Sequence, residues 1–150
     1  MKLRKATLQD IDSLLSLAYA MHDESPRFRQ YKFLPERLEK NLTMVIGMEL
    51  GFAHVAEQDG MIVGAMVAFA MPHFACDILQ ACDMGIFIDD KHRGGTLAAR
   101  LVRAYLGWAE SVGAEPTIGI NTGVHPERTA QLLQALGAKP SGTNWTWGIN

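Results

Sequence analysis

The chain has 150 residues, of which 48% are hydrophobic and 20% charged, and its formal net charge at pH 7 is −2. This size and composition predict one globular domain, residues 1–150, with enough apolar side chains for a core, and the slight negative charge argues against a nucleic-acid-binding surface, which needs a basic stripe. Two cysteines, Cys76 and Cys82, are too few for a disulfide framework or a zinc site, so we expect reduced thiols, no metal and a cytoplasmic protein.

Neither a secretory signal nor a membrane span is predicted. The first six residues are followed by acidic residues instead of an apolar run. The longest apolar stretch, residues 61–74, is interrupted by glycine and proline and is too short to cross a bilayer. We therefore expect no membrane partner.

The first third of the chain predicts a short strand and two helices. Residues 2–6 alternate as a strand, and Thr7 followed by Asp10 is typical of a capped helix start. Helical spacing gives the next segment one apolar face, formed by Ile11, Leu14, Leu15, Ala18 and Met21. This helix ends near Pro26, because the residue before a proline avoids helical angles. The second helix spans residues 35–47, with proline at its first position and glycine at its end.

The middle of the chain predicts three antiparallel strands. Residues 52–57 and 61–71 flank Asp59–Gly60, a strong signal for a two-residue hairpin. Residues 77–88 are long enough for a third strand, and Gly85 is the expected place for a bulge.

The second half of the chain alternates between helices and strands. A helix follows the glycines at 94–95 and ends at Gly113. Its inward face consists of Leu97, Leu101, Ala104, Tyr105 and Trp108. Residues 117–121 predict a short buried strand, residues 126–137 another helix, and residues 143–149 a last strand.

This element order predicts a mixed α/β layer. We expect a mostly antiparallel, twisted sheet flanked by helices, with one parallel pair between residues 83–88 and residues 117–121, where a helix crosses over.

A basic glycine turn, residues 91–96, joins the third strand to the helix that follows it. The first turn of a helix has N–H groups without internal partners and carries partial positive charge, and glycines let an anion approach them closely. An anion site is therefore predicted at the N–H groups of Gly94, Gly95, Thr96, Leu97 and Ala98. The alternative is a tight turn with solvated basic residues. The chain lacks GxxxxGK[ST] and GxGxxG, which argues against NTP and dinucleotide loops.

Three segments resemble motifs of the GNAT superfamily of acyl-CoA-dependent N-acetyltransferases. Residues 93–98 are similar to its [Q/R]-x-x-G-x-[G/A] loop and match at Arg93 and Ala98, with Thr96 in place of the middle glycine. Residues 86–90 resemble its L-x-V-D-P strand end. Residues 133–138 resemble its Y-E-K-L-G-F segment, with leucine at 133 in place of tyrosine. Residues 21–26 also resemble a subgroup of small phage- and prophage-type members.

The resemblance implies acetyl-CoA as co-substrate and no metal. The diphosphate of acetyl-CoA is then expected on the amides of residues 94–98, with Arg93 assisting. In the family, the strand before the loop splays from the next parallel strand, and the pantetheine arm pairs with its exposed edge. Here that edge is Ile86, Phe87 and Ile88.

The resemblance also implies a base for the acceptor amine, and several residues compete for this role. Family members often place an acid where this chain has Asp83, which is otherwise a strand residue in water. His54 and Glu57 on the hairpin are rivals, although His54 is equally explained as a core or surface histidine. Less favoured rivals are His73 and Asp77.

The leaving thiolate lacks an obvious proton donor, because Leu133 stands where the family often has tyrosine. Asn121 or His125 can donate a hydrogen bond, and Asn121 is equally explained as a loop cap. A thiol with a pKa of about 8.5 can leave without full protonation. The missing tyrosine therefore does not exclude a transferase.

Two functions remain open at this point, together with a fold that has no coenzyme site. The first is transfer of an acetyl group from acetyl-CoA to a primary amine; the second is an acyl-CoA-binding module without catalysis. Residues 22–33 are expected either to shape the acceptor entrance or to form a solvated loop. Many family members form homodimers, so the last strand, with Trp145 and Trp147 on one face, belongs either in the core or at such an interface.

Overall fold

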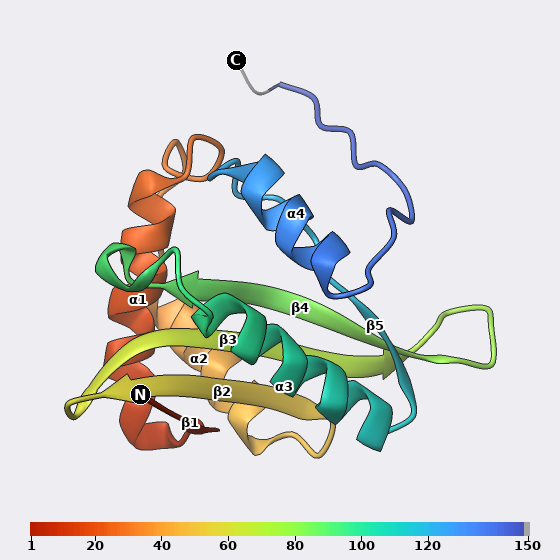
Figure 1. Ribbon diagram of the computed structural model, residues 1–150, viewed down its shortest axis with the longest axis horizontal. Helices are drawn as coiled ribbons and strands as arrows, with labels where there is room; N and C mark the ends of the chain where they lie inside the picture. Colours follow the sequence, from red (N-terminus) through yellow and green to blue (C-terminus); the bar gives the residue numbers. More distant parts are fainter. Residues whose placement is uncertain (149–150) are drawn as a thin grey trace.

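The computed structural model describes residues 1–148, and its centre is a five-stranded sheet in the order β1-β2-β3-β4-β5 (Figure 1). The strands are β1 (Lys2–Lys5), β2 (Gly51–Gln58), β3 (Met61–Pro72), β4 (Leu79–Ile88) and β5 (Ala114–Thr117). Neighbouring strands are antiparallel except β4 and β5, which are parallel. The mixed α/β fold predicted from the sequence is thus confirmed.

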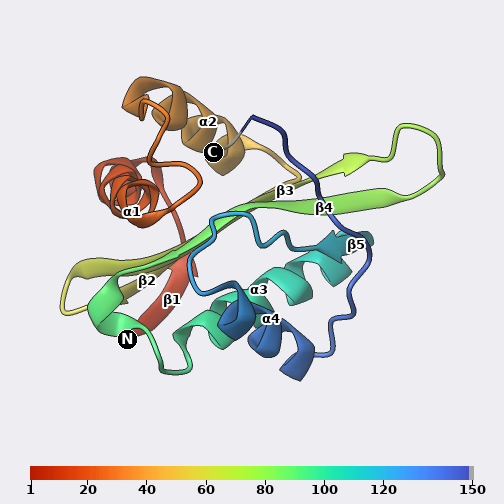
Figure 2. The ribbon, with the colours of Figure 1, turned by 90° about the horizontal axis from the view of Figure 1, so that it is seen from above.

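Helices cover both faces of the sheet (Figure 2). One face carries α1 (Ile11–Glu24) and α2 (Pro35–Gly47), and the other carries α3 (Leu97–Ser111) and α4 (Pro126–Ala135). Short 3-10 turns span Leu8–Asp10 and Asp90–His92. Each helical layer closes its own core, because sheet side chains alternate between the faces. The core under α3 centres on Phe52, Met66, Leu101 and Tyr105, and the core under α1 and α2 on Leu14, Leu42, Val55 and Val67.

Two backbone details in the strands agree with the sequence analysis. The β2–β3 hairpin turns at Asp59 and Gly60, whose φ angles of 52° and 77° are those of a type I′ turn. In β4 the pairing register with β3 slips beside Gly85, and Met84 is left without a partner. The bulge is therefore adjacent to the expected glycine.

The predicted parallel pair is wrong in its position. Residues 79–82 of β4 pair with residues 114–117, and the pairing does not extend to residues 83–88. The strand begins earlier than predicted because only Val112 and Gly113 separate it from α3, so the backbone returns to the sheet at once. The apolar residues 118–120 are not in a strand; they line a cleft.

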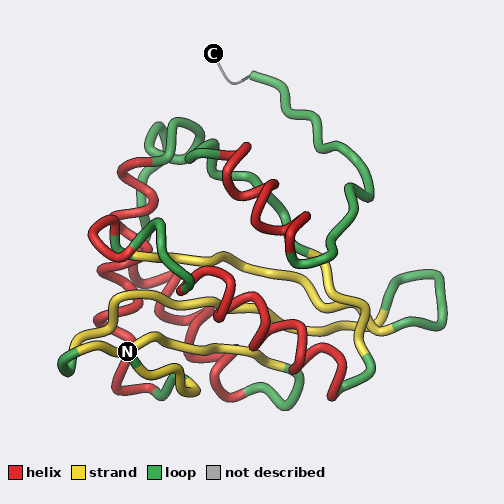
Figure 3. The backbone as a smooth tube through the Cα atoms, viewed as in Figure 1, coloured by secondary structure: helices red, strands yellow, loops and turns green. Residues whose placement is uncertain are grey.

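The predicted last strand is also wrong. Residues 143–148 have no strand conformation (Figure 3), and Ile149 lies outside the described residues. Trp145 and Trp147 are 78% and 87% exposed, so they are not part of the core. Alternation decides which side chains share a face, but a strand forms only where its backbone finds a partner edge.

The helix start predicted at Thr7 is tied to the sheet edge by one carboxylate. Asp10 accepts hydrogen bonds from the Thr7 N–H at 2.8 Å and the Thr7 hydroxyl at 3.1 Å. Arg4 donates to both oxygens of Asp10, at 2.8 and 2.9 Å, and to Glu57 at 2.8 Å. Arg4 is the main cause that lowers the pKa of Asp10 to about 2.

Replacement of Asp10 by asparagine is expected to lower the free energy of unfolding by about 2 kcal/mol at pH 7. The folded-state pKa lies below the unfolded value of 3.8, so this stabilisation is present above pH 3.8 and is lost as the pH falls through about 2. Urea titrations of both proteins from pH 7 down to about pH 2 measure it. A stability difference independent of pH would contradict the ion-pair explanation.

Candidate functional site

The parallel strands separate at a point that is marked by a buried tyrosine of α3. Pairing of β4 with β5 ends at Cys82 and Thr117. The Tyr105 hydroxyl lies 2.8 Å from the Ala81 carbonyl oxygen and 2.9 Å from that of Thr117, and it accepts the Thr117 N–H at 3.2 Å. One side chain thus occupies hydrogen-bonding positions that strand pairing would otherwise use. Burial raises the pKa of this phenol to about 12, so it stays protonated at neutral pH.

The segment after β5 is held away from β4 by the loop that follows α1. Ser25 donates from its hydroxyl to the Thr122 carbonyl at 2.5 Å, and Arg27 donates to the Asn121 carbonyl at 3.3 Å. A Cβ placed on Gly123 would lie 3.6 Å from Pro26, so the two segments run close together here. The diverging strands are therefore fixed at the base by Tyr105 and at the far end by this loop.

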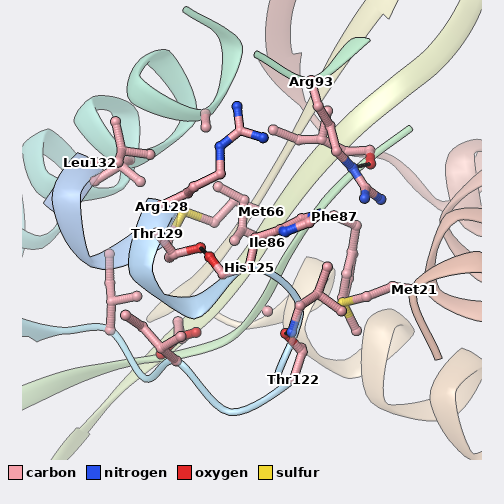
Figure 4. Close-up of a pocket in the computed structure, with 18 of the residues that line it drawn as sticks. Met21, Met66, Ile86, Phe87, Arg93, Thr122, His125, Arg128, Thr129 and Leu132 are labelled. Atoms are coloured by element: carbon pink, nitrogen blue, oxygen red, sulfur yellow. Dashed lines mark hydrogen bonds between the residues drawn. The ribbon is translucent and has the colours of Figure 1, made fainter. Parts of the chain in front are cut away.

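A cleft of about 530 Å³ fills the space between the separated strands (Figure 4). Its walls are the second half of β4, the glycine turn before α3, residues 118–124 and one face of α4, and Glu24 and Met21 of α1 reach its edge. Of the expected cofactor-binding residues, the cleft is lined by Ile86, Phe87, Ile88, Arg93, Gly94, Gly95 and Ala98. Thr96 and Leu97 do not line it, and the Leu97 side chain is buried in the core under α3.

The glycine turn beside this cleft contains a row of unpaired amides, of which Gly94, Gly95 and Ala98 belong to residues that line the cleft. Within residues 1–148, the N–H groups of residues 94–98 donate to no other protein atom. Gly94 has φ +84°, a conformation that side chains other than glycine rarely adopt, and the space in front of it is open. With α3 starting at Leu97, these amides lie at the positive end of a 15-residue helix. The arrangement suits an anion.

Two basic side chains of this turn, Arg93 and His92, are already engaged. The Arg93 guanidinium donates to Glu24 of α1 through two nitrogens, at 2.6 and 3.0 Å, and through Nε to the Ile88 carbonyl at 2.8 Å. The pair with Glu24 raises the pKa of Arg93. His92 Nδ1 lies 2.7 Å from Asp89 Oδ2. Arg93 thus connects α1, the end of β4 and the turn.

The free edge of β4 faces the cleft with alternate backbone groups. Asp89 donates to the Val63 carbonyl of β3, whereas the Ile88 carbonyl accepts from Arg93 on the opposite side. By strand alternation, the N–H and C=O of Ile86 also point away from β3. Because β5 has separated here, an extended ligand can pair with them.

Asp83 and Asn121 meet at the point where the strands part. Asp83 Oδ1 accepts the Gly119 N–H at 2.8 Å, and both residues line the cleft with Asn121. A Cβ on Gly119 would lie 2.6 Å from the Asn121 amide nitrogen, so only glycine allows this approach. Burial raises the pKa of Asp83, and its hydrogen bond from Gly119 opposes that shift only in part.

The other candidate bases do not line the cleft. His54 of β2 stacks on Phe52 with ring centroids 4.3 Å apart, and burial lowers its pKa. Its Nδ1 is buried without a hydrogen-bond partner among the described residues. Glu57 pairs with Arg4 at the sheet edge. His73 accepts two backbone N–H groups in the β3–β4 loop, which also contains Asp77.

Sequence reasoning named His125 as a possible hydrogen-bond donor but missed the cleft-lining role of Arg128 and Thr129 on α4. His125, Arg128 and Thr129 line the cleft with Leu132 and Leu133 (Figure 4). These five positions share a helical face, and Pro126 at the helix start is the signal that places them in the first two turns. His125 has φ +45°, which is unusual for a residue other than glycine.

Two further searches of residues 1–148 bear on membrane and metal binding. No described helix has the length and apolar character needed to cross a bilayer. Nowhere in this part of the chain do three or more His, Cys, Asp or Glu side chains gather as a metal site would require.

Comparison with known proteins gives a family match and structural neighbours. A model described as the acetyltransferase (GNAT) family matches residues 11–138. The BH1408 protein of Bacillus halodurans, solved as a tetramutant, superposes with a TM-score of 0.80 at 15% identity over 99% of each chain. No curated protein matches the chain by sequence.

Two other structural neighbours have acetyltransferase names. An aminoglycoside 6′-N-acetyltransferase from Acinetobacter haemolyticus has a TM-score of 0.76 at 12% identity, over 99% of this chain and 97% of its own. A ribosomal-protein-alanine N-acetyltransferase from Brucella melitensis biovar Abortus has a TM-score of 0.68 at 16% identity, over 97% and 98%. At such identities these likenesses show the fold.

Proposed function

The chain belongs to the acetyltransferase (GNAT) family, and on that premise we propose that it transfers the acetyl group of acetyl-CoA to a primary amine. The observation that carries this proposal is the row of free amides at residues 94–98, at the mouth of a cleft between two separated strands. The acetyl group is supplied as a thioester, an activated acyl donor. The residues of the chain bind it, orient it and accept a proton.

The first task is to hold the diphosphate. The unpaired N–H groups of Gly94 to Ala98 and the positive end of α3 provide donors and partial charge without a side chain. Arg93 keeps this turn in place through Glu24 and the Ile88 carbonyl. Both features support binding of the coenzyme at this end of the cleft.

The second task is to orient the thioester. The Ile86 backbone groups at the free edge of β4 can pair with the two amides of an extended pantetheine arm, a form of strand addition. Such pairing directs the acyl end along the cleft toward Asp83 and Asn121. A backbone N–H in this position also polarises the acyl carbonyl.

The third task is proton transfer. The amine nitrogen forms a bond to the acyl carbon while the carbon–sulfur bond breaks, and the sulfur leaves as thiolate. We assign the amine proton to Asp83, directly or through water, since it is the carboxylate at the point where the strands part. Its raised pKa makes it a stronger base than a solvated aspartate. Asn121 is the proposed hydrogen-bond donor to the thiolate.

The test is release of free thiol from acetyl-CoA in the presence of candidate amines. Aminoglycosides and peptides with N-terminal alanine enter the panel because of the neighbours described above, together with polyamines, lysine peptides and amino acids. We expect release that requires both acetyl-CoA and one class of amine. Saturable binding of acetyl-CoA without release by any amine would contradict the transferase. Absence of binding in calorimetry would contradict the coenzyme site itself.

A further inference from the structure

We propose that Arg128 of α4 binds the phosphates of the coenzyme, and that Arg93 of the glycine turn is a positioning residue that does not contact them. This inference rests on the proposed function, because it concerns the same cleft. The sequence suggested that Arg93 assists in binding the diphosphate, and it gave Arg128 no role because no motif includes that residue. The proposal reverses these two roles.

The charge around the glycine turn gives the first reason. Glu24, Asp89 and Asp90 surround the turn, whereas its cations are Lys91 and Arg93. The carboxylates outnumber the cations, so the turn that looks basic in the sequence carries no excess positive charge in the fold. Lys91 does not line the cleft, and Arg93 is paired with Glu24, so a cation on another element would strengthen the binding of a diphosphate there.

The engagement of Arg93 is the second reason. Three of its nitrogens already donate, two to Glu24 and one to the Ile88 carbonyl, at distances of 2.6 to 3.0 Å. A two-nitrogen contact with a carboxylate is the same geometry that would bind a phosphate. Contact with a ligand phosphate would therefore require Arg93 to give up Glu24 and leave that carboxylate unpaired next to an anion.

The position of Arg128 is the third reason. Arg93 and Arg128 are the two arginines that line the cleft within residues 1–148. Figure 4 shows Arg128 extending from α4 over the cleft, with Arg93 on the opposite side. Arg128 makes no ion pair with any carboxylate among the described residues. Its guanidinium is available, and it lies in the same cleft as Gly94 and Gly95.

Packing of α4 against the core holds Arg128 in its position at the cleft. Leu133 of α4 and Leu136, which follows the helix, are partly buried against the core under α3. Arg128 lies four residues before Leu132 on the face that lines the cleft, so the partial burial of Leu133 also sets the direction of the arginine. A cation on a packed helix loses less conformational freedom on binding than one on a mobile loop.

Calorimetric titration of CoA into the whole protein tests this assignment. Arg128→Gln is expected to raise the dissociation constant of CoA about 10- to 100-fold, as expected for loss of a charge-assisted contact, and to flatten its dependence on salt concentration. Arg93→Gln is expected to change the salt dependence less than Arg128→Gln does, because Arg93 does not contact the phosphates. Arg103→Gln, an exposed arginine of α3 outside the cleft, is the matched control and should bind as wild type.

Two additional arms make the outcome specific. Titration with 3′-dephospho-CoA assigns the contact: an effect retained with this probe places Arg128 on the diphosphate, and an effect lost with it places Arg128 on the 3′-phosphate. Arg128→Lys keeps the charge and should recover part of the affinity, which a purely structural role of the side chain would not predict. Thermal unfolding of each variant checks the fold.

The proposal is overturned if Arg128→Gln binds CoA within twofold of wild type, or if Arg93→Gln and not Arg128→Gln flattens the salt dependence. Wild-type protein that does not bind CoA would overturn the proposed function as well. If the wild type and Arg128→Gln bind CoA equally well, only the assignment of Arg128 is overturned.

Discussion

Replacement of Gly94 by valine is expected to raise the dissociation constant of acetyl-CoA about 100-fold or more. Gly94 has φ +84°, and a β-branched residue cannot hold that angle without strain. The turn must then rotate, and the amides at 94 and 95 leave the row that faces the cleft. Loss of two hydrogen bonds to a charged group accounts for a change of about this size. Calorimetric titration of acetyl-CoA measures it.

Gly113 provides the matched control at the other end of α3. It has φ +70° and, like Gly94, open space where a Cβ would be placed. Gly113→Val should therefore introduce similar backbone strain, but Gly113 does not line the cleft. We expect comparable losses of thermal stability in the two variants and loss of affinity in Gly94→Val alone. If the two variants bind acetyl-CoA with equal affinity, the amide row is not part of the coenzyme site.

Replacement of Asp83 by asparagine is expected to lower kcat about 100-fold or more, with little change in the affinity for acetyl-CoA. The amide oxygen of asparagine can still accept the Gly119 N–H, so the strand separation is retained. The substitution removes the capacity to accept the amine proton. Steady-state rates of thiol release, combined with calorimetry, separate these two quantities.

The same substitution is expected to leave the protein as stable as wild type, or more stable, at pH 7. Burial raises the folded-state pKa of Asp83 above the unfolded value of 3.8, so the folded state binds this proton more tightly than the unfolded state does. That stabilisation is complete below pH 3.8 and is lost as the pH rises through the folded pKa. Denaturant titrations should therefore show that Asp83→Asn becomes more stable relative to wild type as the pH rises through this interval.

Asp77→Asn is the control for catalysis, since Asp77 is an exposed carboxylate of the β3–β4 loop outside the cleft. It should retain wild-type rates. Full activity of Asp83→Asn across the pH range would instead show that Asp83 is not the base. Reduced activity accompanied by reduced stability would indicate a structural role for Asp83.

Local patterns in the sequence were sufficient for the elements that depend on local chemistry. Asp59–Gly60 predicted the hairpin, because a type I′ turn needs residues that tolerate positive φ. The apolar spacing of α1 and α3 predicted which faces are buried. The resemblance of residues 86–90, 93–98 and 133–138 to known motifs indicated the family. The succession of strand, glycines and helix predicted the row of amides.

Only the tertiary structure decided where the strands part and which charges are free. Strand separation depends on Tyr105 reaching two carbonyl oxygens that are distant in sequence, and no local pattern encodes that. The pairing of Arg93 with Glu24 joins residues 69 positions apart, and among the described residues it leaves Arg128 as the unpaired arginine of the cleft. The alternating tryptophans near the C-terminus show the same limit: side-chain pattern is local, whereas pairing, burial and charge balance depend on what the rest of the chain brings alongside.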